Sequence, residues 1–265
     1  MSKILVGCDP EVFVKQNGVF KSAHGLIAGD KKNPQKIPHG AVQVDGMALE
    51  FNIDPAASEH EFILNVNEVF AALKAMVPDY EVVATPVANF DPKYMAEQPE
   101  EALELGCDPD YNGWTGLANP RPNGDRPFRT ASGHVHIGWT DKEDINDGNH
   151  IGRARMAAKQ MDFFLGLPSL FYDNDVKRRE LYGKAGALRT KPYGVEYRTL
   201  SNAWLNSEDR MAWVFQSVQA GMEALFGGWM LEEEFGDIQD IINTSNKRKA
   251  EAIINKAGLP MPKGC

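Results

Sequence analysis

Residues able to bind a cation or a phosphate recur in this chain as pairs two positions apart, each within a segment typical of a β-strand. The four pairs, in chain order, are Asp9/Glu11, Glu50/Asn52, His134/His136 and Glu196/Arg198. In a strand, residues i and i+2 point to the same face, about 6.5–7 Å apart. If the four strands share one sheet, its face carries carboxylates, imidazoles and a guanidinium, which require a compensating cation or polyanion. The pairs therefore predict a metal-dependent active site on a sheet.

The types of these side chains indicate which ion and which chemistry to expect. Several carboxylates with one or two imidazoles and no thiolate suit Mg²⁺ or Mn²⁺, which also bridge phosphates. A His-x-His pair is a common way to direct imidazoles at a metal, the alternative being a solvated or internally hydrogen-bonded pair. Four basic residues lie beside the acidic positions: Lys31, Arg129, Arg189 and Arg198. Each alone is an ordinary surface charge, but together with the acidic set they predict phosphoryl chemistry, because guanidinium groups match phosphate oxygens.

Three familiar kinds of site do not fit the spacing. Gly25, Gly29 and Lys31 resemble a P-loop only loosely, because that motif needs four residues between its glycines, followed at once by Lys and Ser/Thr. A cupin-type metal site requires a Glu a few residues after the second histidine, where Gly138 begins a Gly-Trp-Thr segment. Neither GxSxG nor CxxC occurs, so a serine hydrolase or a thiol oxidoreductase has little support.

Composition narrows the class of protein and its compartment. With 265 residues and 43% hydrophobic content, the chain is long enough to bury a full core. Its net charge of −9 argues against a protein that coats nucleic acid, so no nucleic-acid partner is expected. The three cysteines are far apart and predict neither a disulfide framework nor a zinc knuckle. We expect no signal peptide and no membrane partner, because charge begins early and no apolar run approaches about 20 residues. The chain is therefore expected in the cytoplasm.

Hydrophobic periodicity and turn residues predict the elements that position the pairs. Strands are expected over 3–14, in a hairpin around Gln16-Asn17-Gly18 that continues into a Gly-Val-Phe segment, and over 41–53, 80–87, 134–139 and around 196–198. Helices are expected over 58–77, where Ser58 to Glu61 has capping-box form, over 150–165, over 207–226 and through most of the last sixty residues. Loops are expected over 25–38, around 178–182 and over 107–129, the last either a lid or an ordered surface loop. Strands and helices mix without βαβ alternation, which predicts an α+β fold with a curved, mainly antiparallel sheet backed by helices.

These residues, in this order, resemble the glutamine synthetase and glutamate–cysteine ligase superfamily, and more closely the phage phiEco32-like COOH–NH2 ligase type 2 family. The segments that carry the resemblance extend to about residue 205 and read GCDPEVF, SAHGLIAGDKKNP, VDGMALEFNIDPA, SGHVHIGW and YGKAGALRTKPYGVEYRTLSNAW. The last two are the most specific. The chain departs from the pattern at Asp9, where glutamine synthetases have Glu, and at His134, which follows the glycine directly. It also lacks room for the N-terminal domain that builds their rings, so the resemblance does not extend to that assembly.

The resemblance implies a glutamine-synthetase-like catalytic domain over residues 1–265, with a helical C-terminal portion from about 206 to 265. Such an enzyme uses ATP and Mg²⁺ (or Mn²⁺) to join a small-molecule or peptide carboxylate to an amine through an acyl phosphate. The implied metal ligands are Asp9, Glu11, Glu50, His134 and Glu196. Lys31, Arg189 and Arg198 are implied to bind ATP phosphates, Arg189, Arg198 and His136 to act in catalysis, and Arg129 to clamp the substrate carboxylate. A phage-encoded protein of this kind works in the host cytoplasm.

Two alternatives to the ligase stay open from sequence. One is a phosphotransferase of the guanidino-kinase type, which uses the same fold and also surrounds a phosphate with arginines. The other is a catalytically silent metal-binding protein, although the intact Glu-x-Arg and His-x-His pairs argue against it because inward charges are costly to keep. The identity of the two substrates and the oligomeric state also stay open.

Overall fold

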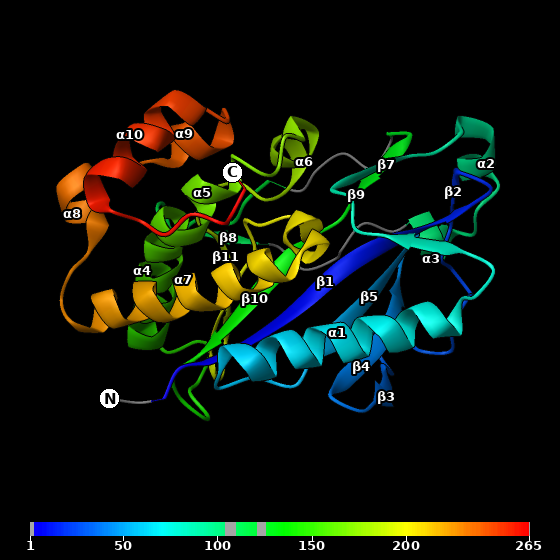
Figure 1. Ribbon diagram of the computed structural model, residues 1–265, viewed down its shortest axis with the longest axis horizontal. Coiled ribbons are helices and arrows are strands. Elements are labelled where there is room, and N and C mark those ends of the chain that lie inside the picture. The colour runs from blue at the N-terminus through cyan, green and yellow to red at the C-terminus, as the bar shows by residue number, and fades with distance from the viewer. Residues whose placement is uncertain (1–2, 104–109, 121–125, 265) are drawn as a thin grey trace.

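A computed structural model describes residues 3–103, 110–120 and 126–264 (Figure 1). Its strands are β1 (Leu5–Gln16), β2 (Val19–Lys21), β3 (Gln35–Ile37), β4 (Gly40–Asp45), β5 (Ala48–Ile53), β6 (Glu81–Val83), β7 (Val87–Asn89), β8 (Tyr111–Asn112), β9 (Phe128–Thr130), β10 (Gly133–Gly138), β11 (Ala187–Lys191) and β12 (Gly194–Tyr197). Within these residues, a ten-stranded antiparallel sheet follows the order β3-β4-β5-β1-β10-β12-β11-β8, with β2 and β6 paired to β1. The predicted α+β class with an antiparallel sheet backed by helices is therefore confirmed.

The long central strand β1 begins the hairpin that the sequence predicts. Asn17 and Gly18 have φ angles of 52° and 77°, and the flanking residues Gln16 and Val19 pair across the turn. Two successive positive φ angles are the geometry of a tight hairpin turn, for which Asn-Gly is the preferred sequence. The hairpin prediction is confirmed, and it places β1 between β5 and β10 in the middle of the sheet.

Several segments differ from the sequence prediction. The strand expected over 41–53 is two strands, β4 and β5, because the chain reverses at Gly46, which has a φ of 57°. The strand expected over 80–87 stops after β6, and β7 instead pairs with β9 in a separate two-stranded sheet. The loop expected around 178–182 contains a short helix, α6 (Val176–Leu181). Of the loop expected over 107–129, the described part contains β8 and the start of β9, while its remainder lies outside the described residues.

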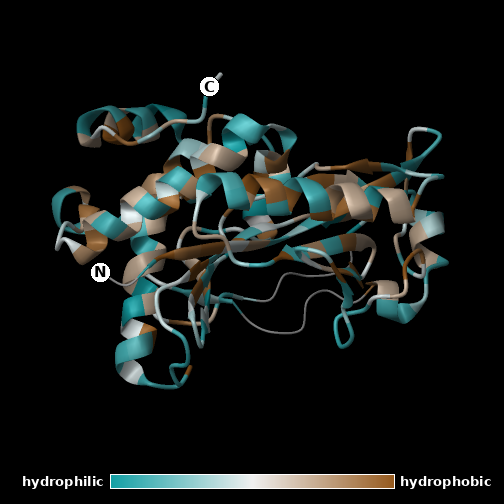
Figure 2. Cartoon of the chain, turned by 60° about the horizontal axis from the view of Figure 1, so that its bottom comes forward, coloured by the Kyte–Doolittle hydropathy of each residue, from teal (hydrophilic) through white to brown (hydrophobic). Residues whose placement is uncertain are grey.

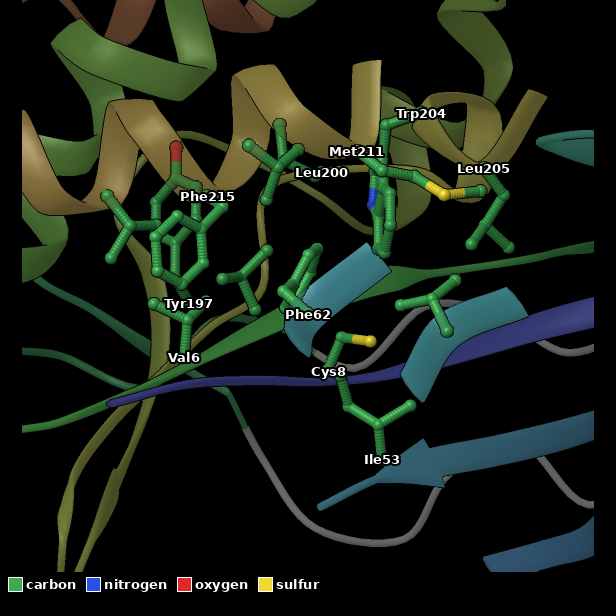
Figure 3. Packing of buried hydrophobic residues seen from close by; sticks show 14 of the residues in the cluster. Val6, Cys8, Ile53, Phe62, Tyr197, Leu200, Trp204, Leu205, Met211 and Phe215 are labelled. Atoms are coloured by element: carbon green, nitrogen blue, oxygen red, sulfur yellow. The ribbon is translucent and has the colours of Figure 1, made fainter. Parts of the chain in front are cut away.

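Helices cover the face of the sheet opposite the charged pairs. The remaining helices are α1 (Glu59–Met76), α2 (Pro92–Ala96), α3 (Glu100–Leu103), α4 (Gly148–Met161), α5 (Leu167–Ser169), α7 (Glu208–Phe226), α8 (Leu231–Phe235), α9 (Gln239–Asn243) and α10 (Lys247–Ala257), with a π-helical turn at Asp162–Gly166 and a 3-10 segment at Asn202–Asn206. Helices α1 and α7 lie side by side along the sheet (Figure 1). Their side chains Phe62 and Phe215 pack with Val6 and Cys8 of β1 in one buried cluster (Figure 3). The predicted covering helices are confirmed.

The cap of α1 follows the predicted sequence signal, and α7 has a serine cap of the same kind. The Ser58 hydroxyl accepts from the Glu61 amide at 3.3 Å, and the Glu61 carboxylate accepts from the Ala57 amide at 2.8 Å. Ser207 caps α7 by accepting from the Arg210 amide. These contacts satisfy amide groups that have no partner within a helix, so they define where each helix begins.

The helices that follow α7 pack onto a second buried cluster at one end of the molecule. Helices α8, α9 and α10 contribute Leu231, Ile242 and Ile254, which pack with Phe163 and Phe164 of the π-helical turn. The outward sides of these helices are largely hydrophilic in Figure 2, while apolar residues gather between the helices and the sheet. The C-terminal part of the chain is helical, as predicted, and it is anchored through the end of α4.

Candidate active site

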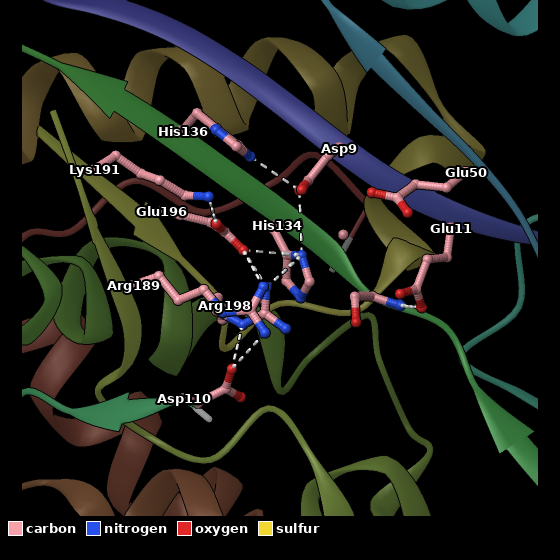
Figure 4. Close-up of polar contacts among 12 residues, drawn as sticks. Asp9, Glu11, Glu50, Asp110, His134, His136, Arg189, Lys191, Glu196 and Arg198 are labelled. Atoms are coloured by element: carbon pink, nitrogen blue, oxygen red, sulfur yellow. Dashed lines mark hydrogen bonds and ion pairs between the residues drawn. The ribbon is translucent and has the colours of Figure 1, made fainter. Parts of the chain in front are cut away.

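The four residue pairs predicted from sequence lie on four neighbouring strands. Their order in the sheet is β5, β1, β10 and β12, and they share the face away from α1 and α7 (Figure 4). The register pairs Glu11 with Glu50, Asp9 with His134, and His136 with Glu196. Arg198 lies one residue beyond β12 and continues the ladder, because its amide donates to the Ala187 carbonyl at 2.8 Å. The predicted arrangement of the pairs on one antiparallel sheet is confirmed.

A compact group of metal-ligand types lies at the centre of this face. One donor atom from each of Asp9, His136 and Glu196 lies within 4.8 Å of the others. His136 Nε2 is 3.0 Å from Asp9 Oδ1, and in the described residues this buried nitrogen makes no well-aligned hydrogen bond. His134 Nδ1 lies 3.2 Å from Asp9 Oδ1 but also 3.2 Å from Arg198 Nη1. His134 Nδ1 also lies 3.6 Å from Glu196 Oε1, so both histidines border this group, and His136 is the one whose donor atom forms the compact set with Asp9 and Glu196.

The neighbours of this group keep its carboxylates ionised. Burial opposes ionisation of Asp9, but His136 and His134 outweigh it and hold the pKa of Asp9 well below its usual value. Burial and the charge of Asp9 oppose ionisation of Glu196, yet Arg198 and the two histidines lower its pKa to about 2. Burial also opposes protonation of His136, but the adjacent Asp9 raises the pKa of that imidazole. The centre of the face thus carries two fixed negative charges.

A second acidic group lies on β1, β4 and β5 and has too little positive charge to balance it. Burial, followed by the charge of Asp45, raises the pKa of Glu11 to about 7. Burial and three neighbouring carboxylates raise the pKa of Glu50 well above its usual value. Glu50 Oε2 accepts from Gln43 Nε2 at 2.8 Å, and Lys31 Nζ lies 2.6 Å from Asp45 Oδ1. Buried carboxylates that repel each other in this way are compensated by a bound cation in the simplest case.

The β11 and β12 side of the face is basic. Arg198 contacts Glu196 Oε1 through Nη1 and lies 2.6 Å from Asp110 Oδ1 through Nε. Arg189 Nη1 lies 3.8 Å from Glu196 Oε1, and its Nη2 lies 3.7 Å from Asp110 Oδ1. Lys191 Nζ is 2.7 Å from Glu196 Oε2. Three basic side chains therefore surround Glu196. Strand β10 separates this basic group from the acidic group on β1.

Sequence reasoning missed Lys191, Tyr193 and Asp110 of this face, as well as Asp45 of the second acidic group. Lys191 stands two positions after Arg189 on β11, so the pair follows the same i and i+2 pattern as the other four and was detectable. Tyr193, in the turn between β11 and β12, bonds His136 Nδ1 through its hydroxyl. Asp110 precedes β8 and reaches the arginines only because β8 pairs with β11. No local sequence pattern marks Tyr193 or Asp110.

Arg129 is placed elsewhere. It belongs to β9, in the small sheet with β7, and its guanidinium donates to the carbonyls of Arg126 and Phe128 at 3.1 Å and of Leu103 at 3.3 Å. These contacts hold backbone around β9, and in the described residues none joins Arg129 to the charged face. The predicted role of Arg129 as a substrate clamp therefore receives no support from its contacts.

The donor set fits Mg²⁺ or Mn²⁺. Those ions prefer carboxylate oxygens with one or two imidazoles, and the face offers Asp9, Glu11, Glu50, Glu196 and His136. The described residues add no thiolate, because Cys8 faces the core beneath α1. A cation would accept the lone pair of His136 Nε2 and relieve the repulsion between Glu11 and Glu50.

Fold and site together define an α+β protein with one charged sheet face. Its acidic residues are of the kind that bind a cation, and its basic residues are of the kind that bind a phosphate. Residues 126–222 match the model of the family described as phage phiEco32-like COOH.NH2 ligase-type 2, which confirms the resemblance over that segment. The name of this family indicates a carboxylate–amine ligase. A search of curated proteins gives no match to the chain. Among the described residues, no helix has the length and apolar character that crossing a membrane requires.

Proposed function

We propose that this protein is an ATP-dependent carboxylate–amine ligase with a glutamine-synthetase-like catalytic domain that works with Mg²⁺ or Mn²⁺. The observation that supports this best is the division of charge across one sheet face. Acidic residues on β5 and β1 face basic residues on β11 and β12, with two histidines between them (Figure 4). A polyphosphate with bound cations has the complementary charge pattern. The family match over residues 126–222, which includes β10 to β12, agrees with this assignment.

Each half of the face has a separate task in the proposed reaction. Asp9, Glu11, Glu50, His134, His136 and Glu196 would hold the cations, which when bound screen the charge of the phosphates. Arg198 and Arg189, with Lys191, meet the oxygens of the transferring phosphoryl group, where planar guanidinium groups bind in pairs of hydrogen bonds. Lys31 lies at the acidic edge, beside Asp45, from where it can reach a phosphate.

The proposed chemistry has two steps. An oxygen of the substrate carboxylate bonds to the γ-phosphorus of ATP while the bond from that phosphorus to the bridging oxygen breaks, which gives an acyl phosphate and ADP. The amine nitrogen then bonds to the acyl carbon, the bond from that carbon to the phosphate oxygen breaks, and the nitrogen loses a proton. Arg198 and Arg189 stabilise the charge that spreads over the phosphoryl oxygens in the first step.

The test uses hydroxylamine as a general amine because it traps acyl phosphates as hydroxamates. The protein is incubated with Mg²⁺, ATP, hydroxylamine and a panel of amino acids and short peptides, and ADP, phosphate and hydroxamates are measured. Hydroxamate formation with equal amounts of ADP and phosphate is expected. A phosphorylated guanidino compound without hydroxamate would instead show a phosphotransferase. Failure to bind ATP by calorimetry would contradict both reactions and favour a silent metal-binding protein.

We keep two further expectations as parts of this proposal. Residues 1–265 form one ligase domain, with the helical portion from about 206 packed onto it through α7 and the second cluster. The protein acts on small-molecule or peptide substrates in the cytoplasm, the host cytoplasm if a phage encodes it. Expression in a bacterial host, followed by fractionation, tests the second expectation.

A further inference from the structure

Tyr193 occupies a fixed position over His136. It lies in the turn between β11 and β12, where its carbonyl accepts from the amides of Trp139 at 3.0 Å and Thr140 at 3.3 Å. Its ring lies against the imidazole of His136, with ring centres 5.9 Å apart and planes inclined by 27°. Its hydroxyl forms a hydrogen bond with His136 Nδ1. Backbone hydrogen bonds fix the position of Tyr193, and its hydroxyl is therefore held beside His136 Nδ1.

The bond at Nδ1 decides what the other nitrogen of His136 can do. Nε2 is the atom that faces Asp9, at 3.0 Å, in the group that also includes Glu196. A neutral imidazole carries one proton, so Nε2 offers a lone pair only when that proton is on Nδ1. A tyrosine hydroxyl can accept from Nδ1–H, and it then stabilises this tautomer.

We propose that Tyr193 is a positioning residue that keeps the proton of His136 on Nδ1, so that Nε2 is free to bind a divalent cation with Asp9 and Glu196. Hydrogen bonds to the second nitrogen of a metal-binding histidine fix both the ring and its tautomer. Tyr193 therefore sets the cation affinity of the group without touching the cation. This inference rests on the cation site of the proposed function.

The substitution Tyr193→Phe removes the hydroxyl and keeps both the ring contact and the backbone bonds of the turn. Tyr94→Phe is the matched control, because the Tyr94 hydroxyl also makes one hydrogen bond, accepting from the Ser22 amide at 2.9 Å, away from the charged face. Binding of Mn²⁺ is measured by electron paramagnetic resonance for the wild type and both variants. We expect Tyr193→Phe to weaken binding by about 10- to 100-fold, as for loss of such a bond, and Tyr94→Phe to leave it unchanged.

A second measurement reads the tautomer with Mg²⁺ bound and without turnover, because in the absence of a cation the Asp9 carboxylate, 3.0 Å from Nε2, favours a proton on Nε2. Long-range ¹H–¹⁵N spectra, recorded as a pH series until the His136 signals reach those of a neutral ring, distinguish Nδ1–H from Nε2–H in each of the six histidines. The signals of His136 are assigned by their loss in His136→Gln. Nδ1–H is expected in the wild type, and Nε2–H is expected to gain population in Tyr193→Phe.

The outcomes separate this inference from the proposed function. If the wild type binds no Mn²⁺, the cation site and the ligase assignment fail. If the wild type binds Mn²⁺ but Tyr193→Phe binds it equally well, only the role of Tyr193 is overturned. An Nε2-protonated His136 in the wild type with Mg²⁺ bound overturns it as well, even if the variant does not fold.

Discussion

At the scale of single residues, the protonation state of each group on the charged face depends on its neighbours as well as on its amino-acid type. Glu196 and Glu11 are both buried glutamates, yet the pKa of Glu196 is about 2 and that of Glu11 about 7. Burial raises both values, but Arg198 and two histidines stand beside Glu196, whereas Asp45 stands beside Glu11. The face therefore combines a glutamate that is already neutralised by protein cations with one that lacks such a partner.

A substitution of Arg198 distinguishes most clearly between a structural ion pair and a catalytic role. It contacts Glu196 and Asp110, so a purely structural account has a geometric basis. Lysine keeps the charge but loses the planar fork, so Arg198→Lys is expected to lower kcat/KM by about 30- to 1,000-fold, equal to about 2–4 kcal/mol of transition-state stabilisation. The ATP dissociation constant, measured by calorimetry, is expected to change much less.

The control for this substitution is Arg153→Lys, because Arg153 pairs with Glu143 at 3.2 Å on an exposed part of the surface. Turnover of the control should equal that of the wild type. Wild-type turnover in Arg198→Lys would favour the structural account. A fall in melting temperature that accounts for the lost activity would do the same.

Asp110 contacts the two arginines at the position that a phosphate would take in the proposed reaction. Its Oδ1 lies 2.6 Å from Arg198 Nε and 3.7 Å from Arg189 Nη2. Asp110→Asn removes the competing negative charge, so we expect a non-hydrolysable ATP analogue to bind about 3- to 10-fold more tightly, which is about 0.7–1.4 kcal/mol. Calorimetry measures this change, with Glu143→Gln as the control for loss of a remote carboxylate. Weaker binding would show that Asp110 holds the arginines in their binding positions.

At the scale of elements, α4 and the π-helical turn that follows it support the β11–β12 hairpin at both ends. His150, in the first turn of α4, bonds the Lys191 carbonyl through Nε2 at 2.7 Å. Asp162, in the π-helical turn, accepts from the Tyr197 hydroxyl at 2.7 Å and from Trp114 Nε1 at 2.6 Å. Lys191 and Tyr197 stand at the two ends of the hairpin that carries Arg189 and Glu196. Helix α4 and the π-helical turn thus hold the β11–β12 hairpin, which carries the basic half of the charged face.

The buried carboxyl of Asp162 predicts a dependence of stability on pH. Burial raises its pKa to about 6, although its hydrogen-bond donors oppose this. Because the folded pKa lies above the unfolded one, the carboxyl contributes stability that is complete below about pH 4 and is lost as pH rises through about 6. The difference in unfolding free energy between the wild type and Asp162→Asn, from urea unfolding, should therefore fall by about 1 kcal/mol between about pH 5 and about pH 8.

Asparagine does not titrate, so this comparison isolates Asp162 from the other ionisable groups. We expect Asp162→Asn to be less stable at both pH values, because an amide NH2 group, which only donates, replaces one of the two oxygens that accept from Trp114 and Tyr197. A difference that stays constant or grows between the two pH values would show that Asp162 is already ionised in the folded protein at low pH.

At the scale of the whole molecule, the described residues form three buried clusters, two of which lie behind the charged face and under the C-terminal helices, respectively. The larger one lies between the sheet and helices α1 and α7, directly behind the charged face. The second lies between the π-helical turn and helices α8 to α10, at the end of the molecule (Figure 1). The larger cluster therefore packs against the back of the strands that carry the charged face. The C-terminal helices contact the π-helical turn that follows α4.

The second cluster gives a prediction about the C-terminal helices. Ile242 of α9 is fully buried, so Ile242→Ala should lower the unfolding free energy by about 2–5 kcal/mol through lost contacts and a residual cavity. Ile145, which is 46% exposed, supplies the control, and Ile145→Ala should change stability by less than about 0.5 kcal/mol. Urea unfolding measures both. ATP binding by the folded protein should be unchanged, and a small effect of Ile242→Ala on stability would mean that α8 to α10 do not share the main unfolding transition.

The sequence by itself determined which side chains face the same way. The spacing of Asp9 and Glu11, or of His134 and His136, places each pair on one side of its strand because a strand has a period of two. The helices that cover the other side followed from apolar periodicity and from caps such as Ser58. These properties depend only on the local backbone, so the antiparallel sheet, the covering helices and the acidic face could be predicted.

Only the tertiary structure decided which of these side chains meet. The order β5-β1-β10-β12 and its register bring both histidines beside Asp9 and Glu196, with His136 in the compact group that could hold a cation. Pairing of β8 with β11 brings Asp110 to the arginines, and the turn before β12 brings Tyr193 to His136. Arg129 has the type expected of a substrate clamp, but its strand pairs elsewhere. Strand order and register arise from contacts between residues far apart in the chain, and no local spacing encodes them.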